Sequence, residues 1–139
     1  MPLAEVARRM SVMGPELGEL ALTIVRWVDD YQPGIVACEF VDADGRRHTL
    51  IDKVPMFSTD ALDATSTYPL WGAVRCTVLR RWTDALGREL LRISTAEPDA
   101  VESTEELQEF VVSKKQVNRI PRGHRDPNAQ GYMVWVEDE

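Results

Sequence analysis

The residues best suited to acid–base chemistry are His48 and Asp52. His48 follows a predicted hairpin turn, and Asp52 lies four residues further on, so an extended chain places both side chains on one face of a strand. A histidine beside a carboxylate can transfer protons near neutral pH. The sequence places no serine or cysteine nucleophile beside this pair. An enzyme that uses His48 and Asp52 is therefore the least favoured of three functional hypotheses.

A second group of residues suits binding better than catalysis. Aromatic side chains fall in or beside an irregular segment at residues 56–71, and aromatic and arginine residues follow on the next predicted strand. The candidate binding residues are Phe57, Tyr68, Trp71, Arg75, Arg81 and Trp82. Aromatic rings at the mouth of a barrel offer stacking area, and arginine adds positive charge. In the structural alternative, the tryptophans lie in the core or cover one end of the barrel, and the arginine stems lie over them.

No motif for a metal or a cofactor is present. Cys38 and Cys76 do not form a CxxC pair, and the two histidines lie far apart in the sequence. The turn at residues 42–45 is similar to the start of a calcium loop, but loop positions six and twelve hold Arg47 and Lys53 instead of glycine and glutamate. We therefore expect no metal, no cofactor and two buried, reduced cysteines.

The elements that must position these residues come from a passage that occurs twice. Each copy starts at a glycine, continues through a β-rich run with a cysteine at the same offset, and turns at a D-A-x-G-R sequence, at residues 42–46 and 84–88. Glycine supplies the positive φ that a tight hairpin turn requires. The repeat predicts two antiparallel hairpins with the cysteines at equivalent positions, where they could be neighbours in a sheet.

The complete pattern predicts a mainly β protein. Apolar alternation and turn residues place strands at residues 19–28, 35–41, 46–54, 71–82, 87–95 and 109–112. Short helical segments are expected at the N-terminus, between the third and fourth strands and before the last strand, at residues 2–12, 59–63 and 103–106. This order favours an antiparallel barrel of five or six strands of the OB type, with an SH3-like barrel or a split sandwich as alternatives.

The domain organisation follows from a change of composition near residue 113. Residues 1–112 are expected to form one barrel domain with its N-terminal helix, and residues 113–139 a C-terminal extension. The extension is polar, but it contains the apolar run Tyr-Met-Val-Trp-Val at residues 132–136. We expect this run to dock on the domain or on a neighbouring chain, which makes a homodimer through the extension one option.

The charge balance limits the classes of partner. The chain of 139 residues has 23 acidic and 16 basic side chains, a net charge of −7. Such a chain repels the phosphates of nucleic acids and anionic membranes. Its charges are also segregated, with six acidic and no basic residues at 96–112 and five basic and no acidic residues at 113–125. Another protein is therefore the expected partner, steered by complementary charge.

Together these observations favour a small, acidic, non-catalytic protein-interaction module, for example an inhibitor or an immunity-type protein. We expect it in the cytoplasm, because neither a signal peptide nor a membrane-spanning run is apparent. The main alternative is an OB-type protein that binds single-stranded nucleic acid or an oligosaccharide.

Overall fold

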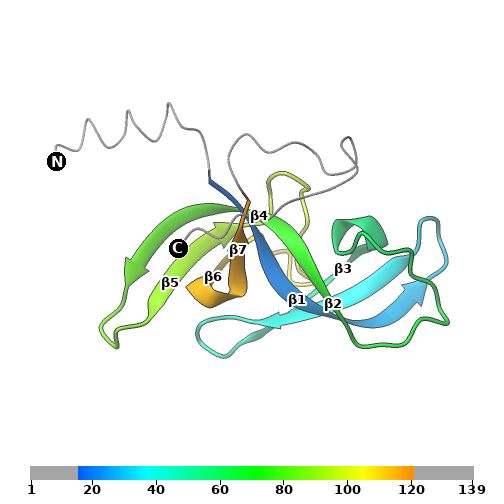
Figure 1. Ribbon diagram of the computed structural model, residues 1–139, viewed down its shortest axis with the longest axis horizontal. Helices are drawn as coiled ribbons and strands as arrows, with labels where there is room; N and C mark the ends of the chain where they lie inside the picture. The colour runs from blue at the N-terminus through cyan, green and yellow to red at the C-terminus, as the bar shows by residue number, and fades with distance from the viewer. Residues whose placement is uncertain (1–15, 121–139) are drawn as a thin grey trace.

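The computed structural model describes residues 16–120 (Figure 1). Seven antiparallel strands make up most of this range: β1 (Glu16–Asp29), β2 (Ile35–Val41), β3 (Arg47–Lys53), β4 (Leu70–Thr83), β5 (Glu89–Ser94), β6 (Glu109–Ser113) and β7 (Val117–Arg119). Two short 3-10 helices complete it, η1 (Val54–Met56) and η2 (Lys114–Gln116). The sheet curls into a half-barrel, so the prediction of a mainly β, antiparallel protein is confirmed.

β1 is the central strand of the sheet. The strand order is β3-β2-β1-β4-β5-β6, and β7 pairs with β1 as well. The first part of β1 pairs with β4, from Glu16 to Ile24, and its later part pairs with β2, from Thr23 to Asp29. β7 pairs with β1 around Leu20. One strand of 14 residues therefore has three strand partners, and in Figure 1 β1 and β4 cross the middle of the molecule side by side.

Irregular pairing bends the long strands. The register between β1 and β2 shifts between Ile24 and Arg26, and the register between β4 and β5 shifts between Val78 and Arg80. An extra residue in one strand of a pair increases the local bend and twist. The bend lets β1 leave β4 and follow β2, and this produces the curl of the half-barrel.

The two D-A-x-G-R turns have the same backbone structure. Gly45 and Gly87 adopt φ values of 84° and 82°, which glycine accommodates without strain. In each turn the leading aspartate, Asp42 or Asp84, accepts hydrogen bonds through Oδ1 from two later backbone N–H groups at 2.9–3.0 Å. The repeat is therefore architectural, since both copies build the same hairpin turn.

The ends of the two hairpins meet. Arg88 donates a hydrogen bond through Nη1 to the carbonyl oxygen of Ala43 at 2.9 Å. The N–H of Ala43 in turn donates to the carbonyl oxygen of Val111 in β6, also at 2.9 Å. Elsewhere Leu50 of β3 forms an isolated bridge with Ser103. These contacts join the β2–β3 hairpin to the far side of the curled sheet.

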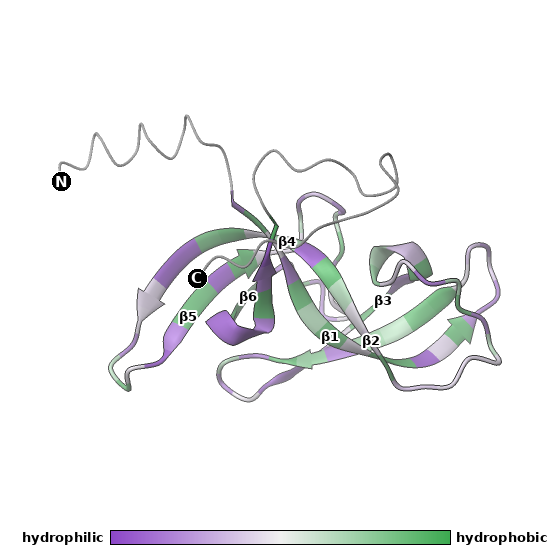
Figure 2. Ribbon diagram, viewed as in Figure 1, coloured by the Kyte–Doolittle hydropathy of each residue, from purple (hydrophilic) through white to green (hydrophobic). Residues whose placement is uncertain are grey.

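The inner face of the half-barrel holds the hydrophobic core. Its buried residues are Leu20, Leu22, Ile24, Val36, Cys38, Phe40, Leu50, Val54, Phe57, Val74, Cys76, Leu91, Ile93, Val101, Phe110 and Val112. Those that lie on strands recur at every second position, as the alternation predicts for a sheet with one buried face. Figure 2 shows this alternation of hydrophobic and hydrophilic residues along β1, β4 and β5.

The expected helical segments are not confirmed. Residues 59–63 form no helix, and the only helical turn of that connection is η1, directly after β3. The predicted capping box at residues 103–106 is a non-helical turn, because Glu106 adopts a left-handed φ of 66°. The N–H of Ser103 also donates to the carbonyl oxygen of Leu107 at 2.9 Å, which closes a loop and not a helical turn. A capping box instead starts η2, between Ser113 and Gln116. The predicted helix at residues 2–12 lies outside the described residues.

β7 was not among the predicted strands, because its sequence is polar. Its backbone nevertheless pairs with β1, and Val117 packs against the core. Backbone hydrogen bonds do not depend on side-chain polarity, so a polar segment can pair with a sheet. The proposed division at residue 112 stays a prediction, and residues 132–136 lie outside the described range. Within residues 16–120, the structure contains no helix with the length and hydrophobicity needed to cross a membrane.

Gly72 of β4 provides a test of the core packing. A Cβ atom at this position would lie 2.9 Å from the carbonyl oxygen of Phe57 and 2.8 Å from Cδ1 of Ile24. We expect Gly72→Ala to lower the free energy of unfolding by about 1–3 kcal/mol, measured by chemical denaturation. An unobstructed strand glycine would instead gain roughly 0.5–1 kcal/mol from alanine. Unchanged or increased stability would contradict the packing described here.

Candidate functional site

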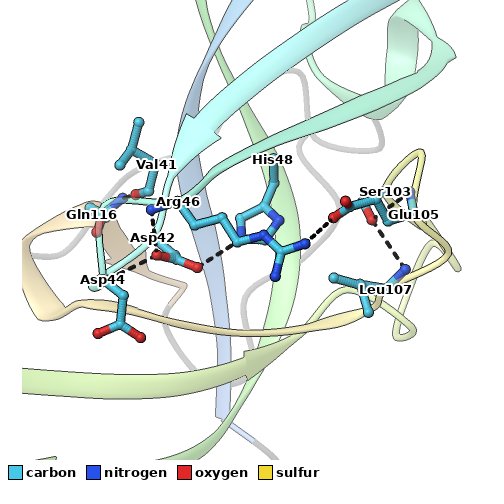
Figure 3. Close-up of polar contacts among 9 residues, drawn as sticks. All are labelled: Val41, Asp42, Asp44, Arg46, His48, Ser103, Glu105, Leu107 and Gln116. Carbon is cyan, nitrogen blue, oxygen red and sulfur yellow. Dashed lines mark hydrogen bonds and ion pairs between the residues drawn. The ribbon is translucent and has the colours of Figure 1, made fainter.

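The structure does not bring His48 and Asp52 together. His48 is buried, with 4% of its surface exposed, and its Nε2 lies 2.8 Å from Oδ2 of Asp42 (Figure 3). Asp52 is four residues away along β3, about 13 Å at the usual rise of a strand. Its carboxylate accepts a hydrogen bond from the N–H of Lys53 at 2.8 Å. The carboxylate partner of His48 is therefore the turn aspartate and not Asp52.

Aromatic rings surround the His48 imidazole. The ring centroids of Phe40 and Phe110 lie 5.2 and 4.8 Å from that of His48. Nδ1 of His48 is buried and has no hydrogen-bond partner among the described residues. This packing connects the turn to the core.

Asp42 connects the turn, the histidine and the backbone. Its Oδ1 accepts from the N–H groups of Asp44 and Arg46, while Oδ2 bonds His48 (Figure 3). Partial burial acts to raise the pKa of Asp42, but the hydrogen bonds from His48 and the two backbone N–H groups lower it further, and the pKa lies below its usual value. Asp42 is therefore a structural carboxylate that stays ionised at neutral pH.

Two of the six candidate binding residues belong to the interior. Phe57 is 3% exposed and lies in the core. Tyr68 is half-buried against the core, and its hydroxyl donates to the carbonyl oxygen of Asp63 at 2.8 Å. Both residues hold the 57–69 connection on the half-barrel.

The candidate arginines have acidic partners. Arg75 makes a two-pronged contact with Asp99, from Nη2 at 2.7 Å and Nε at 3.0 Å. Arg81 is paired with Glu16. Carboxylates thus offset both charges, so the two arginines do not form an open positive surface.

The environment of Trp82 fits the structural alternative better than a role in binding. The side chain is half-buried, opposite Leu90 on the neighbouring strand, and the Arg80 guanidinium lies 4.8 Å from its ring centroid. An arginine thus covers a tryptophan, as the structural alternative expected, although the arginine is Arg80 and not Arg81.

Trp71 differs from the other five residues, because 83% of its surface is exposed. It projects from β4 on the outer face of the sheet, opposite the buried row that contains Val74. Its neighbours on this face are small: Thr23 lies directly across on β1, and Ala73 and Ala21 form the adjacent cross-strand pair. A large aromatic side chain therefore lies beside a group of small side chains.

Charged residues border this group of small side chains. One pair further along the strands, Glu19 lies across from Arg75. On the other side of β1, Thr23 pairs with Glu39, whose carboxylate bonds Arg47 at 3.2 Å. Burial raises the pKa of Glu19, and the positive charge of Arg75 opposes that rise in part. The outer face thus has an aromatic and small-residue centre with a charged border, which we call the Trp71 face.

The two cysteines do not contribute a reactive site. Cys38 pairs with Ile24 and Cys76 with Gly18, so they lie on opposite sides of β1, about 20 Å apart along it. Both are free and buried, and burial raises each thiol pKa to about 12. They are neither neighbours nor bonded. No group of three or more metal-ligating side chains is gathered anywhere in residues 16–120.

Comparisons with known proteins found no match, so the evidence on function comes from the geometry. No protein-family model matches the chain, and no curated protein or solved structure shows significant similarity to it.

Sequence reasoning missed the role of Asp42, although the repeat contained a usable signal. In both turn aspartates, one carboxylate oxygen accepts hydrogen bonds from the turn backbone, and the other oxygen is available to a second partner. In the second copy that partner is Arg88, which donates from Nε to Asp84 at 2.7 Å. In the first copy it is His48. Trp71 was among the candidates, but nothing local distinguished it from Phe57.

Replacing Asp42 tests its structural role. We expect Asp42→Ala to lower the free energy of unfolding by about 2–3 kcal/mol at neutral pH, because three hydrogen bonds to a charged group are lost. The folded-state pKa of Asp42 lies below the usual 3.8. Its stabilising effect is therefore complete above about pH 4 and fades as the pH falls through the lower folded-state pKa. Denaturation at neutral and acidic pH measures both effects.

The matched control for that experiment is Asp44→Ala in the same turn. Asp44 is exposed and contributes only its N–H to the turn, so its loss should change stability by less than about 0.5 kcal/mol. Equal effects of the two substitutions, or an Asp42 effect that persists unchanged at acidic pH, would refute the role described here.

Proposed function

We propose that this protein is a non-catalytic protein-interaction module and that Trp71 is its principal contact residue. The observation that carries the proposal is the exposure of Trp71 near the start of β4, where the strand is paired with β1. A tryptophan side chain buries 150–250 Å² in general when it is covered, and leaving it in water costs that hydrophobic gain. Tryptophan is also among the residues most often found at binding hot spots.

The position of Trp71 on a paired strand favours binding. Nine consecutive residue pairs join β1 to β4 from Glu16 to Ile24, and Trp71 lies within this ladder. A side chain on such an element loses less conformational freedom on binding than one on a loop, so more of its contact energy appears as affinity. The small residues beside it let a partner approach the sheet closely.

The charge distribution supports a protein partner over a polyanion. Residues 16–120 contain 18 acidic and 12 basic side chains. Eight of those basic residues pair with carboxylates: Arg46, Arg47, Arg75, Arg81, Arg88, Arg92, Lys114 and Arg119. An inhibitor or immunity-type protein would use the acidic excess to steer a complementary partner.

The finer fold assignment is part of the same proposal. A central first strand flanked by β2 and β4, with β3 following β2 and β5 following β4, supports an OB-type barrel. The SH3-like barrel remains the alternative. Two buried, reduced cysteines support a cytoplasmic location, because thiols stay reduced there.

A Trp71→Ala variant tests the interaction. We expect the immobilised wild-type chain to retain a specific protein from a lysate of its source organism, and the variant to retain at least about tenfold less, a loss of 1.4 kcal/mol or more. Quantitative mass spectrometry of the eluates provides the measurement. The matched control is Leu86→Ala, since Leu86 is 80% exposed on the β4–β5 turn, away from the Trp71 face. Equal retention by all three chains would overturn the role of Trp71.

The nucleic-acid alternative makes the opposite prediction for tryptophan fluorescence. Bases that stack on Trp71 would quench its emission, and the quenching would weaken with salt. Because the net charge is −7, and Arg75 and Arg81 are ion-paired, we expect no quenching by single-stranded DNA, even at low salt. Saturable quenching in the wild-type chain that is lost in Trp71→Ala would instead support an OB-type oligonucleotide binder.

A further inference from the structure

On the basis of the proposed function, we infer that a partner for the Trp71 face is a second copy of this chain, docked face to face about a twofold axis. The axis would run across the strands, parallel to the sheet, above the cross-strand pair of Leu22 and Gly72. A twofold interface requires a surface that is complementary to itself. The Trp71 face meets this requirement in both shape and charge.

The shape argument rests on the spacing of Trp71 and Ala73. These residues lie on either side of Gly72 on the same face of β4, so the proposed axis places each Trp71 over the partner's Ala73. Packed sheets lie about 10 Å apart, and a tryptophan fits between them only where the opposite side chain is small. On β1, the same axis sets Thr23 against the partner's Ala21. Both bulky rings are thus accommodated by small residues.

The charge argument rests on Glu19 and Arg26, which both lie on the outer face of β1. Glu19 is three residues before Leu22. Arg26 is four residues after Leu22, but the register shift between Ile24 and Arg26 takes up one residue, so Arg26 is also three pairing steps away. The axis therefore places Glu19 opposite the partner's Arg26, and Arg26 opposite the partner's Glu19.

Both charges are available for such a contact. Neither Glu19 nor Arg26 takes part in an ion pair within residues 16–120. Arg26 is exposed, and Glu19 is half-buried beside Arg75. Two reciprocal Glu19–Arg26 pairs would form at the ends of the Trp71–Ala73 contacts. They would fix the direction in which the two sheets are aligned, because like charges would meet in the reverse orientation.

The net charge sets the conditions for observing the dimer. Two chains of charge −7 repel each other over long distances, and salt screens that repulsion with a Debye length of about 8 Å at physiological ionic strength. The close Glu19–Arg26 contacts are screened less. We therefore expect association at physiological salt to be stronger than at low salt, the reverse of what attraction between opposite net charges would give.

The decisive experiment is sedimentation velocity of the full chain over a concentration series at physiological salt. We expect reversible dimerisation by the wild-type chain and at least about tenfold weaker dimerisation by Trp71→Ala, with Leu86→Ala unchanged. Trp71 is exposed, so the alanine variant should keep the fold, and thermal melting checks this. A wild-type chain that stays monomeric throughout, or a dimer that Trp71→Ala does not weaken, overturns the inference.

A charge exchange tests the orientation. Glu19→Arg gives each chain an arginine at both positions 19 and 26, and Arg26→Glu gives each chain a glutamate at both. Like charges then face each other across the interface, so each variant alone should dimerise at least about tenfold more weakly than the wild type. An equimolar mixture should restore association, because every arginine then meets a glutamate. A mixture that associates no better than the separate variants overturns this arrangement.

The outcomes separate this inference from the proposed function. A monomeric wild-type chain that still captures another protein through Trp71 refutes the dimer and retains the interaction module. If the wild-type chain neither dimerises nor captures another protein through Trp71, both the inference and the proposed function are refuted. A dimer that survives Trp71→Ala but is lost when residues 121–139 are removed assigns dimerisation to the C-terminal extension, and this also refutes the inference.

Discussion

The pairing of β1 on both sides is the constraint on which the rest of the structure depends. Its alternate residues Leu20, Leu22 and Ile24 are fully or almost fully buried and hold the inner row of the core. Because side chains alternate along a strand, that inner row also fixes which residues face outward. A slip of one residue would exchange the two rows. The composition of the Trp71 face is therefore a consequence of how the core is packed.

The buried histidine shows how a pair suited to catalysis can serve the fold. His48 and Asp42 have the residue types of an acid–base pair, but aromatic rings enclose the imidazole and the carboxylate is committed to the turn. The same turn without a histidine, at Asp84, recruits an arginine instead. A turn aspartate thus has one oxygen left over, and the surrounding sequence decides what binds it.

Exposed aromatic area and acidic charge act over different distances. The electrostatic field of the carboxylate excess extends over about a Debye length, whereas an exposed side chain such as Trp71 gains energy only when another surface covers it. In the proposed interaction with a partner of opposite charge, the carboxylates would raise the rate of encounter, and burial of Trp71 would slow dissociation. The small residues beside Trp71 matter for the second step, since they allow close packing.

The sequence by itself determined the local features: most strands, the two aspartate–glycine turns and the inward rows, because alternation and glycine conformation act over a few residues. It could not reveal β7, whose polar sequence gives no strand signal although its backbone pairs with β1, nor exclude a helix at residues 103–106, where Glu106 has a left-handed backbone conformation. Only the tertiary structure decided that Asp42 binds His48 and that Phe57 is buried while Trp71 is exposed. These outcomes depend on which strands become neighbours, and no local pattern encodes that.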